Sequence, residues 1–133
     1  MYEDKYFNIA KEVSEMSNHR CRLGCVVVDH HRIISSGYNS ATKCHRIQKE
    51  LDRKYFPQQE CSGPVHAEMS ALIPLVKRRV DLTGATVFVY RQKKDGTMAM
   101  ARPCPRCMEY IRRCGIKHIK YSTDDGFASE RVV

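Results

Sequence analysis

Pro103-Cys104-Pro105-Arg106-Cys107, taken with His66-Ala67-Glu68, is the stretch that decides how this chain is organised. Its two cysteines are three positions apart, so both side chains face the same way on the first turn of a helix. With the histidine they supply one imidazole and two thiolates, which is a three-ligand zinc site with an open fourth position. The alternative is a zinc ion held only for stability, with its fourth ligand elsewhere. Structural zinc sites usually contain two Cys pairs and this chain has one, so we predict a catalytic zinc ion.

Both motifs are expected at the start of a helix. Residues 66–80 and 105–114 have the apolar spacing of helices, with Pro74 expected to kink or shorten the first and Gly115 to end the second. Helix N-termini present unpaired N–H groups and partial positive charge, which favour thiolates. Two helix starts that meet over a sheet would bring the three ligands to one ion, with Glu68 beside it as an acid or base.

The other segments predict one domain built from a sheet and helices. The expected elements are a helix at 4–16, strands at 23–28 and 32–36 joined by a tight polar turn, a helix at 66–80, a strand at 85–90, a helix at 105–114 and a strand at 116–121. Residues 40–64 form an irregular insert in which 46–55 could be helical, and a short tail follows residue 121. This order predicts a mixed sheet with helices on both faces and with its last two strands parallel.

The composition suits a single domain over residues 1–133. Hydrophobic residues make up 42% of the chain, and no apolar run approaches the roughly 20 residues that span a membrane. The acidic, mixed start of the chain does not resemble a signal peptide. Seven cysteines are an odd number and two of them are candidate ligands, so we expect a reducing, cytoplasmic location. The net charge of +8 favours anionic partners such as nucleotides, although scattered basic residues also serve solubility.

These motifs resemble the cytidine deaminase superfamily, and within it the deoxycytidylate deaminase group. The H-x-E and P-C-x-x-C pair is the signature of zinc nucleobase deaminases. The resemblance covers nearly the whole chain, on the segments 23–28, 37–39, 66–68, 103–107 and 115–119. It implies a three-layer α/β/α cytidine-deaminase-like fold. It also implies that His66, Cys104 and Cys107 bind zinc while Glu68 transfers protons during hydrolytic loss of ammonia.

The resemblance also implies residues that hold the substrate. Asn39, in the Gly-Tyr-Asn segment, is expected to bind the sugar through a hydrogen bond, and the backbone N–H of Ala67 is expected to contact the pyrimidine. Tyr38 either stacks on the base or packs beside the strand end. The first ligand is His, as in the deoxycytidylate and tRNA-adenosine branches. The long insert between Asn39 and His66 resembles the deoxycytidylate branch, so we expect a deoxycytidine nucleotide as substrate.

A nucleotide substrate needs cations at one end of its pocket. Lys43, Arg46 and Arg102 are the candidates for contact with a 5′-phosphate, since Arg can bind phosphate through two donors. Two departures from the family pattern lie nearby. Ala101-Arg102 stands where relatives often have Ser or Thr before Pro-Cys, and the segment 91–102 is longer and more basic than expected. An Arg beside the pocket would suit a nucleic-acid backbone equally well.

Two alternative functions remain open at this stage. One is a deaminase of bases in single-stranded nucleic acid or tRNA, and the other is a catalytically inactive, zinc-stabilised binding module. A second zinc site at Cys44 and Cys61, or at the pair His19 and Cys21, has some support in the family, although the spacing is not a standard ligand pattern. The superfamily is typically oligomeric, so a homo-oligomer is expected.

Overall fold

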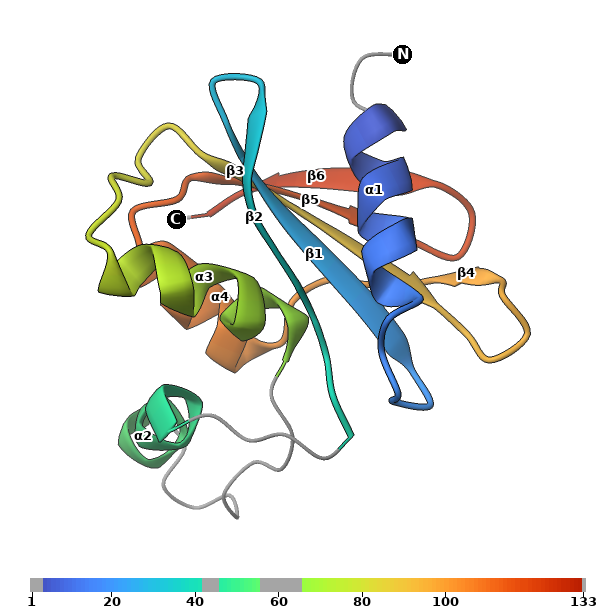
Figure 1. Ribbon diagram of the computed structural model, residues 1–133, viewed down its shortest axis with the longest axis horizontal. Coiled ribbons are helices and arrows are strands. Elements are labelled where there is room, and N and C mark those ends of the chain that lie inside the picture. The colour runs from blue at the N-terminus through green and yellow to red at the C-terminus, as the bar shows by residue number, and fades with distance from the viewer. Residues whose placement is uncertain (1–3, 42–45, 56–65, 133) are drawn as a thin grey trace.

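The computed structural model of the protein describes residues 4–41, 46–55 and 66–132 (Figure 1). The helices and strands, in chain order, are α1 (Asp4–Ser14), β1 (Arg22–Asp29), β2 (Arg32–Tyr38), α2 (Arg46–Tyr55), α3 (Ala67–Lys77), β3 (Thr86–Gln92), β4 (Met98–Ala99), α4 (Pro105–Arg113), β5 (His118–Ser122) and β6 (Phe127–Arg131). The six strands of these residues form one sheet in the order β2-β1-β3-β5-β6, with β4 paired to β3. Only β3 and β5 are parallel, and helix α4 connects them, as the sequence predicts.

Alternation along the two central strands creates the three layers. Successive side chains of a strand point to opposite faces of the sheet. Val26 and Val28 of β1 pack with Phe88 of β3 under helix α1, whereas Val27 and Val87 lie in the core beneath α3 and α4. Figure 1 shows α1 on one side of the sheet and α3 with α4 on the other. The predicted three-layer α/β/α arrangement is therefore confirmed.

Glycines set the distance between the sheet and the helices. A Cβ at Gly24 of β1 would lie 2.1 Å from the carbonyl oxygen of Ala10 in α1. A Cβ at Gly37 of β2 would lie 2.5 Å from the backbone nitrogen of Ala71 in α3. Both distances are far shorter than van der Waals contact, so only glycine allows the helix backbones to approach this closely. The beginning of α3, with its candidate ligand, is thus seated directly on β2.

The expected hairpin is present, and its turn has a specific geometry. Asp29 pairs with Arg32, which leaves a two-residue loop, and both loop residues have positive φ, 49° at His30 and 65° at His31. Positive φ at both positions is typical of the type I′ turn, whose twist matches that of the flanking strands. The predicted helix at residues 46–55 is also confirmed, since α2 has these bounds.

The structure corrects the sequence prediction in three places. Helix α3 ends at Lys77 and not at residue 80, because Arg79 adopts a left-handed φ of 58°. The segment expected as a tail forms strand β6, which pairs with β5 and places Phe127 in a stacked contact with Phe7, 3.9 Å between ring centroids. The short strand β4 was not expected either. Edge strands of this kind carry little apolar periodicity, so the sequence gives them only a weak signal.

Within the described part of the chain, every helix is too short or too polar to span a membrane.

Candidate active site

The two predicted ligand motifs occupy equivalent positions in the fold. His66 is the N-cap residue of α3 and Cys104 is the N-cap residue of α4, with φ and ψ of −81° and 154° and of −67° and 165°. Neither side chain caps its own helix. Pro105 follows as the first residue of α4, where a missing N–H breaks no helical hydrogen bond. Both side chains are therefore available to a third group while the positive ends of the two helices face the same site.

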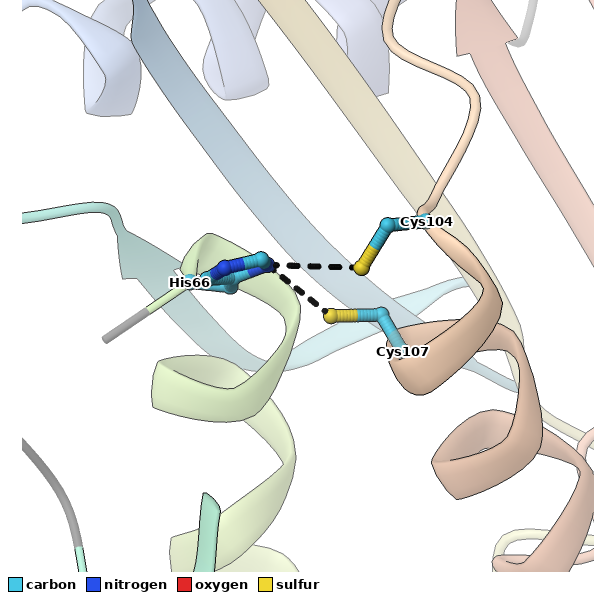
Figure 2. Close-up of side chains that lie close together, drawn as sticks. All are labelled: His66, Cys104 and Cys107. Carbon is cyan, nitrogen blue, oxygen red and sulfur yellow. Dashed lines mark hydrogen bonds between the residues drawn. The ribbon is translucent and has the colours of Figure 1, made fainter. Parts of the chain in front are cut away.

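The three ligand atoms converge (Figure 2). The Nδ1 atom of His66 lies 3.6 Å from Sγ of Cys104 and 3.3 Å from Sγ of Cys107. In a tetrahedral zinc site with ordinary Zn–N and Zn–S bonds, such ligand atoms stand roughly 3.6 Å apart. The donor set and its spacing thus fit one zinc ion. Among the described residues this is the one group of three or more potential ligand side chains close enough to share a metal.

The electrostatics of the site favour a bound cation. A hydrogen bond from the Cys107 thiol lowers the pKa of Cys104 to about 3, and the same hydrogen bond raises the pKa of Cys107. The hydrogen bond to Cys104 raises the pKa of His66. These contacts favour the thiolate form of Cys104, which is the form that binds a metal ion. A bound metal ion would take the place of the protons in the hydrogen bonds among Cys104, Cys107 and His66.

Glu68 is the second residue of α3 and is buried, with 4% of its surface exposed. Burial raises the pKa of its carboxyl group, while the charge on His66 opposes part of this effect. Its Oε1 atom has no hydrogen-bond partner among the described residues. A buried carboxylate with an unsatisfied oxygen next to a metal site is suited to accept and return a proton.

A residue that the sequence did not single out supports the first ligand. Gln48 of α2 is buried, and its Oε1 accepts a hydrogen bond from the backbone N–H of His66 at 3.0 Å. An outer residue of this kind fixes the orientation of a metal ligand. The sequence of α2 gives no signal for this role, because neither the burial of Gln48 nor its target can be deduced from periodicity.

A cavity of about 290 Å³ opens beside the site. This volume is close to the lower end of the range for small-molecule pockets, about 300–1,000 Å³. The described residues that line it are His19, Cys21, Leu23, Asn39, Ser40, His66 and Arg91. The cavity therefore joins a metal ligand to the predicted sugar-binding residue.

The side chain of Asn39 is held by three hydrogen bonds. Its Oδ1 accepts from Oγ of Ser17 at 2.7 Å and from the backbone N–H of Leu23 at 2.9 Å, and its Nδ2 donates to the carbonyl of Cys21 at 2.7 Å. An amide group has two N–H donors, so Asn39 retains one for a ligand in the cavity. Ala67, the other predicted contact, is the first residue of α3, so its N–H has no acceptor within the helix.

Three other predicted substrate contacts, Tyr38, Arg46 and Arg102, are not among the described residues that line this cavity. Tyr38 is partly buried at the end of β2, opposite Gly24. Arg46 is 86% exposed and lies 3.8 Å from Glu50. Arg102 points its guanidinium to Glu130, with Nε–Oε2 and Nη2–Oε1 distances of 2.6 and 3.1 Å. Lys43 is outside the described residues.

Only some of the predicted ligands of a second zinc site lie in the described residues. Cys44 and Cys61 lie outside the described residues. His19 and Cys21 both line the cavity, where Nδ1 of His19 accepts a hydrogen bond from the backbone N–H of Cys21 at 3.0 Å. This contact orders the loop before β1 but brings no third ligand from the described residues to the pair.

Comparison with known proteins agrees with this site. Residues 1–123 match the family described as the cytidine and deoxycytidylate deaminase zinc-binding region. The deoxycytidylate deaminase of Mycobacterium phage D29 is 32% identical over 130 residues, covering 89% of this chain and 92% of that protein.

Solved structures of similar proteins share the fold. The dCMP deaminase of cyanophage S-TIM5 in complex with dCMP and dUMP has a TM-score of 0.62 and 26% identity, covering 90% of this chain and 79% of that one. A cytidine deaminase from Burkholderia pseudomallei has a TM-score of 0.69 over 99% of this chain and 94% of its own. At 13% identity, the second likeness concerns the fold alone.

Proposed function

Because this chain belongs to the cytidine and deoxycytidylate deaminase zinc-binding family, we propose that it deaminates dCMP by hydrolysis. The reaction consumes one water and yields dUMP and ammonia. The preference for a mononucleotide is supported by the similarity to two phage enzymes whose names give this substrate.

The observation that carries the proposal is the placement of Glu68 beside the three converging ligands. A zinc-stabilised binding module needs the ligands but no acid or base. Here a buried carboxyl group with an unsatisfied oxygen follows the first ligand by two residues, on the same first helical turn. Burying a carboxyl oxygen without a hydrogen-bond partner is costly, which supports a role in chemistry.

The residues of the chain divide the chemistry between them. His66, Cys104 and Cys107 would hold the zinc ion, which supplies Lewis-acid activation of water at neutral pH. Glu68 takes a proton from the attacking water and transfers it to N3 of the cytosine ring. Glu68 then takes the proton of the hydroxyl group added at C4 and passes it to the amino group, which leaves as ammonia while the C4 carbonyl forms. The carboxylate is unchanged at the end of the cycle.

Two backbone and side-chain donors orient the substrate. The N–H of Ala67, which has no acceptor within α3, lies at the positive end of this helix and suits the carbonyl oxygen of the pyrimidine. The remaining N–H of Asn39 suits a sugar hydroxyl. Because the other three hydrogen-bonding positions of Asn39 are occupied, its amide is fixed before the substrate binds.

Ammonia release tests the proposal directly. Purified, zinc-loaded protein is offered dCMP, deoxycytidine, dCTP and a cytosine-containing single-stranded oligonucleotide in parallel. Preferential turnover of dCMP supports the proposal. Turnover of the oligonucleotide alone overturns it and favours the nucleic-acid alternative, for which binding should weaken steeply with salt. No ammonia from any substrate favours the inactive binding module.

We further infer a homo-oligomer in the cytoplasm. Val76 and Val80 expose apolar surface beside α3, next to Tyr110 and Cys114 of the α4 region, and a second subunit would cover such a surface. All five cysteines of the described segments are free thiols, which suits a reducing compartment. Sedimentation analysis of the zinc-loaded protein measures the oligomeric state.

A further inference from the structure

Arg91 places a cation in the wall of the cavity that contains His66. It lies near the end of β3, between Leu23 of β1 and Ala99 of β4 in the strand register. Its backbone N–H donates to Oγ of Ser122, which in turn donates to the carbonyl of Ala99. The backbone of Arg91 is thus fixed by three neighbouring strands, and its side chain extends from a rigid support.

The guanidinium of Arg91 has weak partners. Its Nη2 contacts Sγ of Cys21 at 3.2 Å, and its Nη1 contacts the carbonyl of Met100 at 3.4 Å. Sulfur is a poor acceptor, and the second distance is long for an N–H···O hydrogen bond. The Nε atom is buried and has no acceptor among the described residues. The guanidinium therefore retains most of its capacity to bind an anionic oxygen.

Two other arginines of the described segments each form a two-point contact with a carboxylate. Arg102 forms a two-point contact with Glu130, and Arg112 forms one with Glu109. No Asp or Glu within the described segments pairs with Arg91, and none is among the described residues that line the cavity. A cation in the wall of a cavity, with no described carboxylate to pair with it, favours a ligand with negative charge.

We propose that Arg91 binds the 5′-phosphate of the substrate, in place of the predicted contacts from Arg46 and Arg102. The assignment rests on the proposed function, since the phosphate is that of dCMP. A phosphate presents several oxygens, so it can accept from both Nη atoms of the guanidinium. The sulfur of Cys21 then gives up its contact with Nη2 to a stronger acceptor. Arg91 in this role selects a nucleotide over a nucleoside without touching the reacting atoms.

Equilibrium binding and turnover together test the role of Arg91. The variants are Arg91→Gln and Arg91→Lys, with Arg22→Gln as control. Arg22 is the neighbouring strand cation: its Nη2 donates to the carbonyl of Lys93, and it is not among the residues lining the cavity. Zinc-loaded proteins are titrated with dUMP and with deoxyuridine, and kinetic constants are measured for dCMP, deoxycytidine and a cytosine-containing oligonucleotide.

The expected result is a loss confined to the phosphorylated ligands. Arg91→Gln should weaken dUMP binding and raise the KM for dCMP about tenfold to hundredfold, the effect of one charge-assisted contact. The constants for deoxycytidine and deoxyuridine should stay within about twofold, and Arg91→Lys should recover part of the loss. Arg22→Gln should leave the binding and kinetic constants of both the phosphorylated and the unphosphorylated ligands unchanged.

The other outcomes separate the two proposals. If wild-type protein deaminates dCMP and Arg91→Gln keeps the preference for phosphate, the role of Arg91 is overturned while the function stands. Equal losses for nucleotide and nucleoside would indicate a structural role and also overturn it. If dUMP binds through Arg91 but dCMP yields no ammonia, the phosphate site stands and the function fails. If Arg91→Gln impaired turnover of the oligonucleotide alone, Arg91 would bind a phosphodiester, and the assignment to the phosphate of a mononucleotide would be overturned.

Discussion

The side chain of Gln48 accepts a hydrogen bond from the backbone N–H of His66, and this contact ties helix α2 to the start of α3. Gln48 is 3% exposed although α2 is rich in charged residues. The N–H that it satisfies belongs to the N-cap residue whose ring is a predicted metal ligand. The insert between Asn39 and His66 thus contributes directly to the geometry of the site.

We predict that Gln48→Ala lowers zinc affinity. The substitution leaves a buried N–H without its acceptor and frees the His66 backbone to move, and loss of such an outer contact typically weakens metal binding about tenfold to hundredfold. Competition with a chromophoric chelator measures the change. Glu50→Ala, on the same helix but 63% exposed at its side chain, is the control. Equal affinities for the two variants would contradict the role of Gln48.

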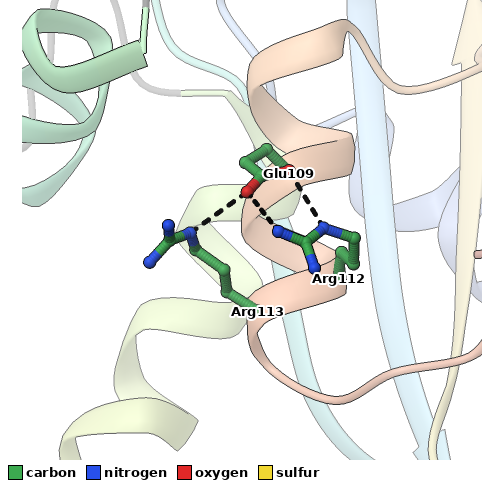
Figure 3. A network of polar contacts seen from close by, with 3 residues as sticks. All are labelled: Glu109, Arg112 and Arg113. Atoms are coloured by element: carbon green, nitrogen blue, oxygen red, sulfur yellow. Dashed lines mark hydrogen bonds and ion pairs between the residues drawn. The ribbon is translucent and has the colours of Figure 1, made fainter. Parts of the chain in front are cut away.

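Glu68→Gln should abolish turnover and leave zinc in place. The amide fills the same volume but cannot take up and return a proton, and the loss of a general acid–base group typically costs about 10²–10⁴-fold in rate. Ammonia release and zinc content are measured on the same preparation. The matched control is Glu109→Gln on α4, whose carboxylate pairs only with surface cations, Arg112 and Arg113, in the described structure (Figure 3). Substantial turnover by Glu68→Gln would rule out the proton-transfer role.

Gly37→Ala should destabilise the fold and the zinc site together. Its Cβ would lie 2.5 Å from the nitrogen of Ala71 and 2.8 Å from the carbonyl oxygen of Ala67, so α3 would have to move away from β2. Overpacking of this kind costs about 1–3 kcal/mol or more. Urea unfolding and zinc content report the two effects. Gly126→Ala has nothing within 4 Å of the new Cβ and should stay within about 0.5 kcal/mol of wild type. A similar stability for both variants would show that the helix adapts.

The contact between Arg102 and Glu130 should make stability depend on pH. Hydrogen bonds from Arg102, and then from Tyr121, lower the pKa of the Glu130 carboxyl in the folded chain. A lowered folded pKa means that the stabilisation is complete above the ordinary Glu pKa of about 4.3 and is lost as the pH falls through the folded value. Because the pair is largely exposed, Glu130→Gln should cost under about 1 kcal/mol at pH 7.

Unfolding of wild type and Glu130→Gln by urea at pH 7 and at pH 3 measures this dependence. The difference in free energy of unfolding should shrink at the lower pH, because below the ordinary Glu pKa of about 4.3 the unfolded chain takes up a proton at residue 130 more readily than the folded chain. A difference that is the same at both pH values would show that the charge on Glu130 does not stabilise the fold.

The sequence predicts the metal ligands well because their chemistry is local. Cys104 and Cys107 share one helical turn, and His66 is the only histidine with a carboxylate two residues later at a predicted helix start. Continuous apolar runs also predict both central strands, since each strand buries both of its faces. The parallel pairing of β3 and β5 follows from the helix between them.

The second half of the site depends on contacts that the sequence does not encode locally. Arg102 was a natural phosphate candidate because it adjoins the cysteine motif, but Glu130 of an unexpected strand engages its guanidinium. Arg91 reaches the cavity only because β3 pairs with β1, which brings Cys21 beside it. Gln48 lies in the insert, whose position relative to α3 cannot be derived from periodicity. Long-range register, and not residue type, decides these three contacts.

The ligands also mark a particular point in the assembly of the chain. His66 and Cys104 are separated by 38 positions, and β3 lies between them in the middle of the sheet. They can meet only after the loop through β3 has closed, and closing such a loop carries an entropy cost that a metal cross-link offsets. In a nascent or partly unfolded chain, the ligand side chains are therefore far apart and do not form a metal site. The three ligands therefore come together only when the segments on both sides of β3 have folded, and a bound metal ion would stabilise that folded arrangement.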